Sequence, residues 1–146
     1  MYIISKCLLG HNCKYNGGNN KNENVIEFCN KYKYIAVCPE SLGNLPCPRP
    51  PAEITEGCVI DKNGRDVTQS FADGAKAAMN ICIKASEELG ERLEGAILKA
   101  NSPSCGYGKV YDGTFSGVLT DGNGIFARLL KENGIDIITE KEKIKW

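Results

Sequence analysis

The segment Tyr2-Ile-Ile-Ser-Lys-Cys7 decides the fold, because it joins a short apolar strand directly to a cysteine. The same pattern recurs in Tyr34-Ile-Ala-Val-Cys38, and the apolar run Gly95-Ala-Ile-Leu98 is followed a few residues later by Cys105. Aromatic and β-branched residues favour strands. In a parallel α/β sheet the carboxyl ends of the strands lie at one edge, where ligands collect. The sequence therefore predicts three thiols at one edge of one sheet.

Helical patterns separate these strands. Apolar residues at helical spacing predict helices over 23–32, from residue 68 or 70 to residue 89, and over 124–133. A last strand is expected over 135–138. Alternating strands and helices are typical of a parallel sheet with helices on its faces. We therefore expect residues 1–146 to form a single three-layer α/β domain, with a mostly parallel, Rossmann-like sheet.

Two longer stretches are predicted to be loops. Residues 41–53 contain four of the six prolines, which excludes a regular helix or a central strand. Residues 101–122 form a second loop with strand-like fragments. Between them, Asn63-Gly64 predicts the turn of a hairpin within 57–67. Long loops inside a compact domain often carry function.

The composition argues against several classes of function. Eighteen basic and 18 acidic residues give a net charge of zero, so no strong attraction to nucleic acid or to an anionic membrane is expected. No apolar run reaches the roughly 20 residues that span a bilayer, and residues 1–7 do not resemble a secretory signal. We expect a cytoplasmic protein with no membrane attachment and no stable binding to nucleic acid.

Eight cysteines are many for a chain of 146 residues. In a reducing cytoplasm they indicate metal binding or catalysis rather than a disulfide framework. Cys29 and Cys82 fall on apolar helix faces and are expected to pack in the core, and Cys58 is also expected to be structural. His11 is the only histidine, so a catalytic triad or a His-rich metal site has little support.

The three strand-end cysteines Cys7, Cys38 and Cys105 are the candidate metal ligands. No Cys-x-x-Cys pair or ferredoxin spacing occurs, which argues against a zinc ribbon, a rubredoxin-like site and a thioredoxin site. Three thiolates from separate loops suit an iron–sulfur cluster, and a [4Fe–4S] cube held in this way leaves one iron without a protein ligand. Cys13 stays open as a fourth ligand, a sulfur carrier or a bystander, and Cys47 has no assigned role.

Two glutamates are candidates for different roles. Glu40 directly follows Cys38-Pro39, and a carboxylate beside a metal site can act as the general base that activates water. A solvated surface glutamate is the alternative. Glu53 closes the segment Arg49-Pro-Pro-Ala-Glu53, and we expect it to pair with Arg49 and hold the loop.

The segment before Cys105 supplies hydroxyl groups and a cation. Ser102 and Ser104 flank a proline. The hydroxyl of each either donates a hydrogen bond to a substrate carbonyl or relays a proton, or it caps a turn. Lys99 and Asn101 stand at the end of the third predicted strand, where they either bind a substrate or make structural contacts.

Five motifs in this order resemble the small thiouracil desulfidases. They are Cys7-Leu-Leu-Gly10 with Tyr15 and Gly17, Cys38-Pro-Glu40, Pro48-Arg-Pro-Pro-Ala-Glu53, Ser102-Pro-Ser-Cys-Gly106 and Tyr111-Asp-Gly-Thr-Phe-Ser-Gly117. Each motif alone is weak, but the set in this order is specific and runs through nearly the whole chain. Lys14 and Asn16 replace an expected Arg and Asp, and Asn44 and Cys47 replace an expected Gly and Thr.

The resemblance implies a [4Fe–4S] cluster held by Cys7, Cys38 and Cys105. Its fourth iron would bind the sulfur of a thiolated pyrimidine. The resemblance also implies that Glu40 and a serine of the segment 102–104 assist an activated water, which replaces sulfur by oxygen without net redox change. The expected reaction converts 2-thiouracil into uracil and sulfide, with a thiolated nucleoside or tRNA base as the alternative substrate.

Two other functions stay open on the same cysteines. One is a non-catalytic module that carries an iron–sulfur cluster or sulfide to a partner. The other is a zinc-dependent hydrolase. Sulfide release from 2-thiouracil would distinguish an enzyme from a carrier, and metal analysis would show whether the protein binds iron or zinc.

Overall fold

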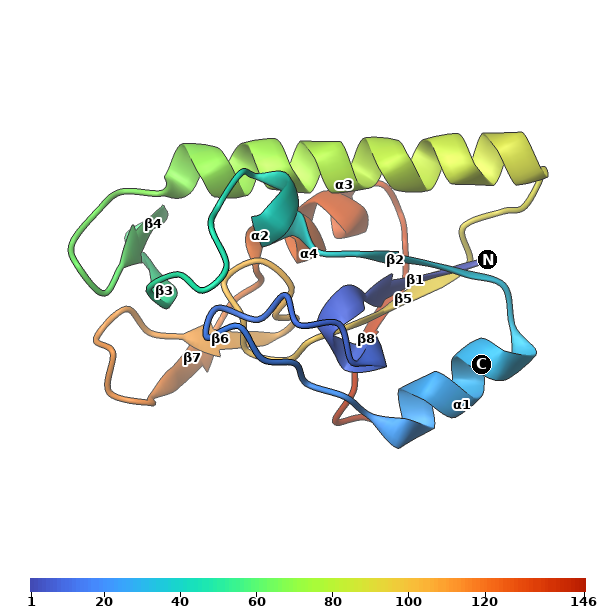
Figure 1. Cartoon of the computed structure of the whole chain (residues 1–146), viewed down its shortest axis with the longest axis horizontal. Helices are drawn as coiled ribbons and strands as arrows, with labels where there is room; N and C mark the ends of the chain where they lie inside the picture. The colour runs from blue at the N-terminus through green and yellow to red at the C-terminus, as the bar shows by residue number, and fades with distance from the viewer.

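A four-stranded parallel sheet lies at the centre of the computed structural model, which describes residues 1–146 (Figure 1). Its strands stand in the order β2 (Tyr34–Val37), β1 (Tyr2–Ser5), β5 (Gly95–Leu98) and β8 (Ile137–Thr139). Each neighbouring pair is parallel. Strands β1 and β5 are buried along their whole length, which explains their uninterrupted apolar sequences.

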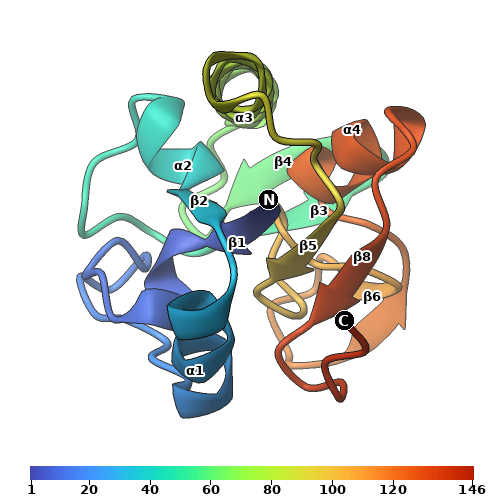
Figure 2. The ribbon, with the colours of Figure 1, turned by 90° about the vertical axis from the view of Figure 1, so that its right-hand side faces the viewer.

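Helices cover both faces of this sheet, as Figure 2 shows. On one face, α3 (Thr68–Leu89) and α4 (Ile125–Glu132) pack around a cluster that contains Ile3 and Phe126. On the other face, α1 (Glu23–Lys31) packs around a second cluster with Tyr2, Ile4 and Phe28 among its members. The predicted three-layer α/β architecture with a mostly parallel sheet is confirmed.

The chain reverses its direction of travel across the sheet at β1. It moves from β1 to β2 through α1, and then returns past β1 to β5 through α3. Because such crossovers are right-handed, a reversal of direction places the connecting helices on opposite faces. Ligands in open α/β sheets bind at this reversal, beyond the carboxyl ends of the strands.

Two antiparallel hairpins lie beyond the carboxyl edge of the sheet (Figure 1). The first consists of β3 (Ala52–Thr55) and β4 (Cys58–Asp61). The second consists of β6 (Lys109–Tyr111) and β7 (Leu119–Asp121). The first spans the end of the proline-rich stretch and part of the predicted hairpin region, and the second lies within the predicted loop of residues 101–122. Both contribute residues to the wall of a cavity beside the strand ends.

The first hairpin turns at a different place from the predicted one. Its turn is Glu56-Gly57, with φ of 50° and 81°, and two residues with positive φ match the twist of paired strands. The predicted signal Asn63-Gly64 does form a turn, but the chain beyond it makes only one isolated bridge, between Ile60 and Asp66. The proline-rich stretch also contains more regular structure than expected, because the short helix α2 (Pro39–Leu42) and strand β3 extend into its two ends.

The cysteines that were assigned to packing differ in burial. Cys82 on α3 is fully buried in the first core cluster. Cys29 on α1 is partly buried against the second cluster. Cys58 is exposed on β4, so it packs less than expected.

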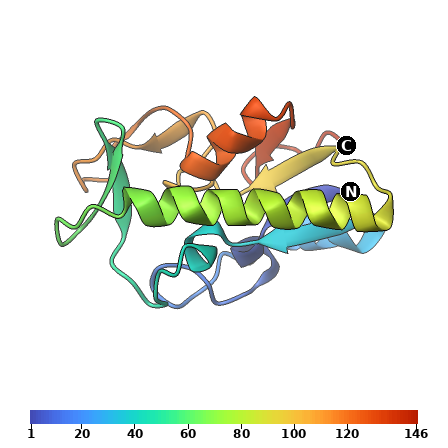
Figure 3. The same ribbon diagram turned by 90° about the horizontal axis from the view of Figure 1, so that it is seen from above.

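Helix α2 lies directly against α3, which runs along the molecule above the sheet (Figure 3). Two glycines permit this contact. A Cβ atom on Gly74 would overlap the carbonyl oxygen of Pro39, and one on Gly43 would overlap that of Ser70. The close approach of the two backbones therefore fixes the first turn of α2, which carries Glu40.

Gly74→Ala should destabilise the protein, although alanine favours a helix over glycine by about 1 kcal/mol. Overpacking typically costs about 1–3 kcal/mol, and the atom that the new Cβ would meet is a backbone oxygen, which has little room to move. With a cost near the upper end of that range and the helix preference subtracted, the free energy of unfolding in urea should fall by about 2 kcal/mol. Asn80→Ala, at an exposed position of the same helix, is the control and should leave stability unchanged or slightly higher. Equal stability of Gly74→Ala and the parent protein would show that α2 and α3 can separate freely.

Candidate active site

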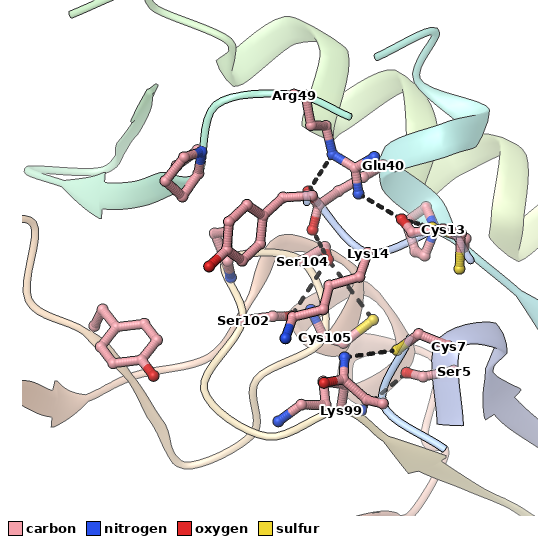
Figure 4. A pocket seen from close by; sticks show the side chains of 18 of the residues that line it. Ser5, Cys7, Cys13, Lys14, Glu40, Arg49, Lys99, Ser102, Ser104 and Cys105 are labelled. Carbon is pink, nitrogen blue, oxygen red and sulfur yellow. Dashed lines mark hydrogen bonds and ion pairs between the residues drawn. The ribbon is translucent and has the colours of Figure 1, made fainter. Parts of the chain in front are cut away.

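A cavity of about 470 Å³ lies at the carboxyl edge of the sheet, with residues of both hairpins in its wall. The structure brings all six of the predicted site residues to this cavity (Figure 4). They are the cysteines Cys7, Cys38 and Cys105, the carboxylate of Glu40, and the hydroxyls of Ser102 and Ser104.

Short backbone elements set the positions of the first two thiols. Cys7 lies in the 3₁₀ helix η1 (Lys6–Leu9), directly after β1. Its carbonyl oxygen accepts a hydrogen bond from the backbone N–H of Asn20 at 3.0 Å, which closes the loop that follows. Cys38 is the residue before α2, and Pro39 occupies the first helical position, where proline is well suited. Both thiols are therefore attached to regular structure at strand ends.

Cys105 lies in a turn that docks on the N-terminus of α4. The Oγ of Ser102 accepts the backbone N–H of Cys105 at 2.7 Å. The carbonyl oxygen of Ser104 accepts the N–H groups of Phe126 and Ala127 at 2.9 and 3.2 Å. These bonds satisfy N–H groups that a helix start leaves free. They hold the turn in place, and they give Ser102 the capping role that was one of its two predicted alternatives.

Two of the three thiols accept a hydrogen bond from a neighbouring side chain. Asn20 Nδ2 donates to Cys7 at 3.4 Å, and Ser41 Oγ donates to Cys38 at 3.3 Å. Ser104 Oγ lies 3.7 Å from the sulfur of Cys105, but its one proton is donated to Glu40. Such bonds stabilise negative charge on sulfur, and the thiolate is the form that binds metals. Sequence reasoning missed Asn20 and Ser41, because no local pattern marks a side chain that meets a cysteine through folding.

The protonation of the thiols differs with their surroundings. Burial raises the pKa of Cys7, and it raises the pKa of Cys105 to about 12. A hydrogen bond with the Cys13 thiol, supported by bonds from Ser41, lowers the pKa of Cys38 to about 6. The same bond raises the pKa of Cys13. In the metal-free protein Cys38 is therefore the most acidic of the three candidate ligands.

The carboxylate of Glu40 is held between a cation and a hydroxyl. Arg49 Nε donates to its Oε1 at 3.0 Å, and Ser104 Oγ donates to its Oε2 at 2.8 Å. The Arg49 side chain is only 4% exposed and also donates to the carbonyl oxygens of Pro46 and Cys13. Arg49 therefore fixes the direction of the carboxylate and joins two loops over the cavity.

The predicted ion pair between Arg49 and Glu53 does not form. Glu53 belongs to β3 and instead accepts the backbone N–H groups of Gly113 and Phe115, at 3.0 and 3.1 Å. Arg49 reaches Glu40, which is nine positions earlier in the chain. Closeness in sequence was the reason for the wrong pairing, since the start of β3 directs the two side chains to different partners.

The other candidate residues have minor places in this arrangement. Cys13 lines the cavity, whereas Cys47, His11 and Asn101 do not. The Cys47 thiol donates to two backbone carbonyl oxygens of the loop around Cys13, at 3.3 and 3.4 Å, and so ties that loop to the proline-rich segment. Lys99 lines the cavity, but its ammonium group forms an ion pair of 3.3 Å with Glu140, which does not line the cavity.

The spacing of the thiols bears on which metal centre they fit. No three His, Cys, Asp or Glu side chains lie close enough together to hold one metal ion. A single zinc ion would require each sulfur at about 2.3 Å from one point. Cysteines that share a cavity at larger separations suit a centre of several atoms.

Comparisons with known proteins agree with these features. Residues 2–142 match the 2-thiouracil desulfurase family. The chain is 37% identical to the uncharacterized protein YbbK of Bacillus subtilis (strain 168), over 97% of both chains. It also resembles the solved structure of the [4Fe-4S]-dependent thiouracil desulfidase TudS. The TM-score is 0.85 and the identity 37%, over 96% of this chain and 90% of that one.

Alkylation of the metal-free protein should begin at Cys38 as the pH rises. Because its pKa is lowered to about 6, this thiol is half ionised near pH 6 and mostly ionised at pH 7, whereas Cys105 with a pKa of about 12 stays protonated. Iodoacetamide labelling from pH 5 to 9, followed by peptide mass spectrometry, measures the reactivity of the Cys38 thiol and of the Cys105 thiol as a function of pH. Cys13→Ala should move the Cys38 profile to higher pH. Identical profiles for Cys38 and Cys105 would contradict the assignment.

Proposed function

The chain belongs to the 2-thiouracil desulfurase family, and from this premise we propose that it is an enzyme that removes sulfur from a thiolated pyrimidine. The observation that carries the proposal is the convergence of Cys7, Cys38 and Cys105 on one cavity that also contains Glu40 and Ser104. The similarity to TudS along nearly the whole chain supports it.

The donor set fits a [4Fe–4S] cluster. Thiolates from three separate loops are soft ligands of the kind that select iron–sulfur centres. They do not form a single-ion site, and hydrogen bonds from Asn20 and Ser41 support negative charge on the sulfurs of Cys7 and Cys38. When bound, such a cluster would supply a Lewis acid for the sulfur of the substrate and so would polarise the carbon–sulfur bond.

The residues beside the thiols suit the proton transfers of the reaction. Glu40 accepts a proton from a water molecule, and the resulting hydroxide adds to the carbon that bears sulfur. The carbon–sulfur bond then breaks, so that water and a thiocarbonyl become a carbonyl and hydrogen sulfide with no change of redox state. Ser104 holds the Oε2 of Glu40, and Arg49 holds its Oε1. Ser102 supports the turn of Cys105 rather than the chemistry.

The two alternative functions have less support. A carrier of clusters or sulfide has no need for a carboxylate fixed by a cation and a hydroxyl beside the thiols. A zinc-dependent hydrolase would need a tighter ligand set than these side chains form. The enzymatic proposal accounts for both features.

A cavity of about 470 Å³ suits a small-molecule substrate, with 2-thiouracil as the leading candidate. No helix in the chain combines the length and the apolar character that crossing a membrane requires. The cytoplasmic location and the lack of stable nucleic-acid binding stay predictions from the sequence.

Anaerobic reconstitution should give a protein with iron and sulfide in the ratio of a [4Fe–4S] cluster that releases sulfide from 2-thiouracil. Cys7→Ala, Cys38→Ala and Cys105→Ala should each lose iron and activity together, because each removes one of the three ligands. Cys82→Ala, at a buried core position away from the cavity, is the matched control and should keep both. A full iron content in all three ligand variants would overturn the ligand assignment.

Glu40→Gln should keep the cluster but lose turnover. The loss of a general base typically costs about 100-fold or more in rate, so kcat for sulfide release should fall by at least about that factor while the visible absorption stays unchanged. Glu27→Gln, at an exposed position of α1, is the control. Full activity of Glu40→Gln would show that another group activates the water.

A further inference from the structure

Two of the sequence motifs meet beside the cavity although they are far apart in the chain. The loop of residues 112–118 joins β6 to β7 and lies against β3. The Oε1 atom of Glu53 accepts the backbone N–H of Gly113 at 3.0 Å and that of Phe115 at 3.1 Å. Because Glu53 is only 8% exposed, these charge-assisted bonds are shielded from water. A single carboxylate oxygen therefore fixes two points of the loop.

The backbone of Phe115 lies in an unfavourable region. Its φ is 54°, and a bulky residue rarely adopts a positive value. Such a conformation persists only where the surroundings enforce it, and it is common at ligand sites. Here the bonds to Glu53 enforce it, together with Gly113, on which a Cβ atom would overlap the side chain of Thr55. The loop is therefore held in one conformation by contacts with β3.

The side chain of Phe115 is not part of the hydrophobic core. It belongs to neither core cluster. It is half-buried and lines the cavity that contains the cysteines and Glu40. Tyr15, another aromatic residue of the wall, is 40% exposed on a polar loop. Phe115 thus combines partial exposure, a place in the cavity wall and a backbone conformation that costs energy to maintain.

We propose that Phe115 provides the surface on which the pyrimidine ring stacks, and that Glu53 is the positioning residue that holds Phe115 there. This inference rests on the proposed function, since it assigns the binding surface for that substrate. Stacking on an aromatic ring suits any planar base. A ring held in place before the substrate arrives binds with a smaller loss of freedom. Glu53 acts through Phe115 and does not contact the reacting atoms.

Removal of the Phe115 ring should weaken substrate binding without affecting the cluster. The loss of base–aromatic stacking typically lowers affinity by about tenfold, so Phe115→Gly and Phe115→Leu should raise KM for 2-thiouracil by about that factor. Iron content and visible absorption should stay at parent values. Phe115→Gly also tests folding, because glycine accepts positive φ and should leave thermal stability intact. Phe115→Tyr should retain the parent KM.

The positioning role of Glu53 requires a separate comparison. Glu53→Gln keeps an oxygen acceptor and should retain most of the affinity, whereas Glu53→Leu removes both bonds and should raise KM with little change in kcat. The double variant Glu53→Leu/Phe115→Gly should have no higher KM than Phe115→Gly alone, because the two residues act as a unit. Val118→Ala is the control, because Val118 is an exposed residue of the same β6–β7 loop that does not line the cavity. Its KM should match that of the parent protein.

The outcomes distinguish this inference from the proposed function. An unchanged KM in Phe115→Gly, with an active parent protein, overturns the stacking role and leaves the desulfidase activity intact. Additive effects of the Glu53 and Phe115 substitutions on KM overturn the positioning role of Glu53. A reconstituted parent protein that releases no sulfide overturns both the function and the inference.

Discussion

Parallel pairing of β1 with both β2 and β5 is the constraint on which the site depends. Tyr2 pairs with Tyr34 on one side and with Gly95 on the other, and Ile3 and Ile4 between these ladders are fully buried. Three strands that are hydrogen-bonded side by side must end at the same edge. The register of the sheet therefore brings Cys7 and Cys38 to one edge, whereas Cys105 reaches that edge through the turn that docks on α4.

The arrangement beyond that edge depends on polar groups that are buried and satisfied. Arg49 forms an ion pair with Glu40 and also donates hydrogen bonds to two carbonyl oxygens of the loops. No buried side-chain nitrogen or oxygen atom in the protein lacks a hydrogen-bond partner. Breaking a buried ion pair costs more folding free energy than breaking one on the surface, because it leaves an unpaired buried charge. The loops at the mouth of the cavity are therefore held by directional bonds rather than by apolar packing, and a catalytic carboxylate gains a fixed orientation from the same bonds.

The sequence predicted those features that are encoded by neighbouring residues. The apolar runs at residues 2–4 and 95–98 identified buried strands, and Gly90 ends α3 with a φ of 62° as expected of a helix stop. Features that arise from contacts between residues far apart in the chain could not be predicted from the sequence. The partner of Arg49 was wrongly taken to be Glu53, and the hairpin turn at Glu56-Gly57 lacks the asparagine–glycine signal that was sought. Of the two candidate serines, only the fold shows that Ser104 reaches Glu40 whereas Ser102 caps the turn.

The turn that carries Cys105 is bonded to the amide groups at the start of α4, Cys7 lies in the short helix η1, and Cys38 directly precedes α2. Small zinc domains, by contrast, are disordered until the ion arrives. Here the backbone around each candidate ligand is attached to helices and strands by hydrogen bonds that the polypeptide itself supplies.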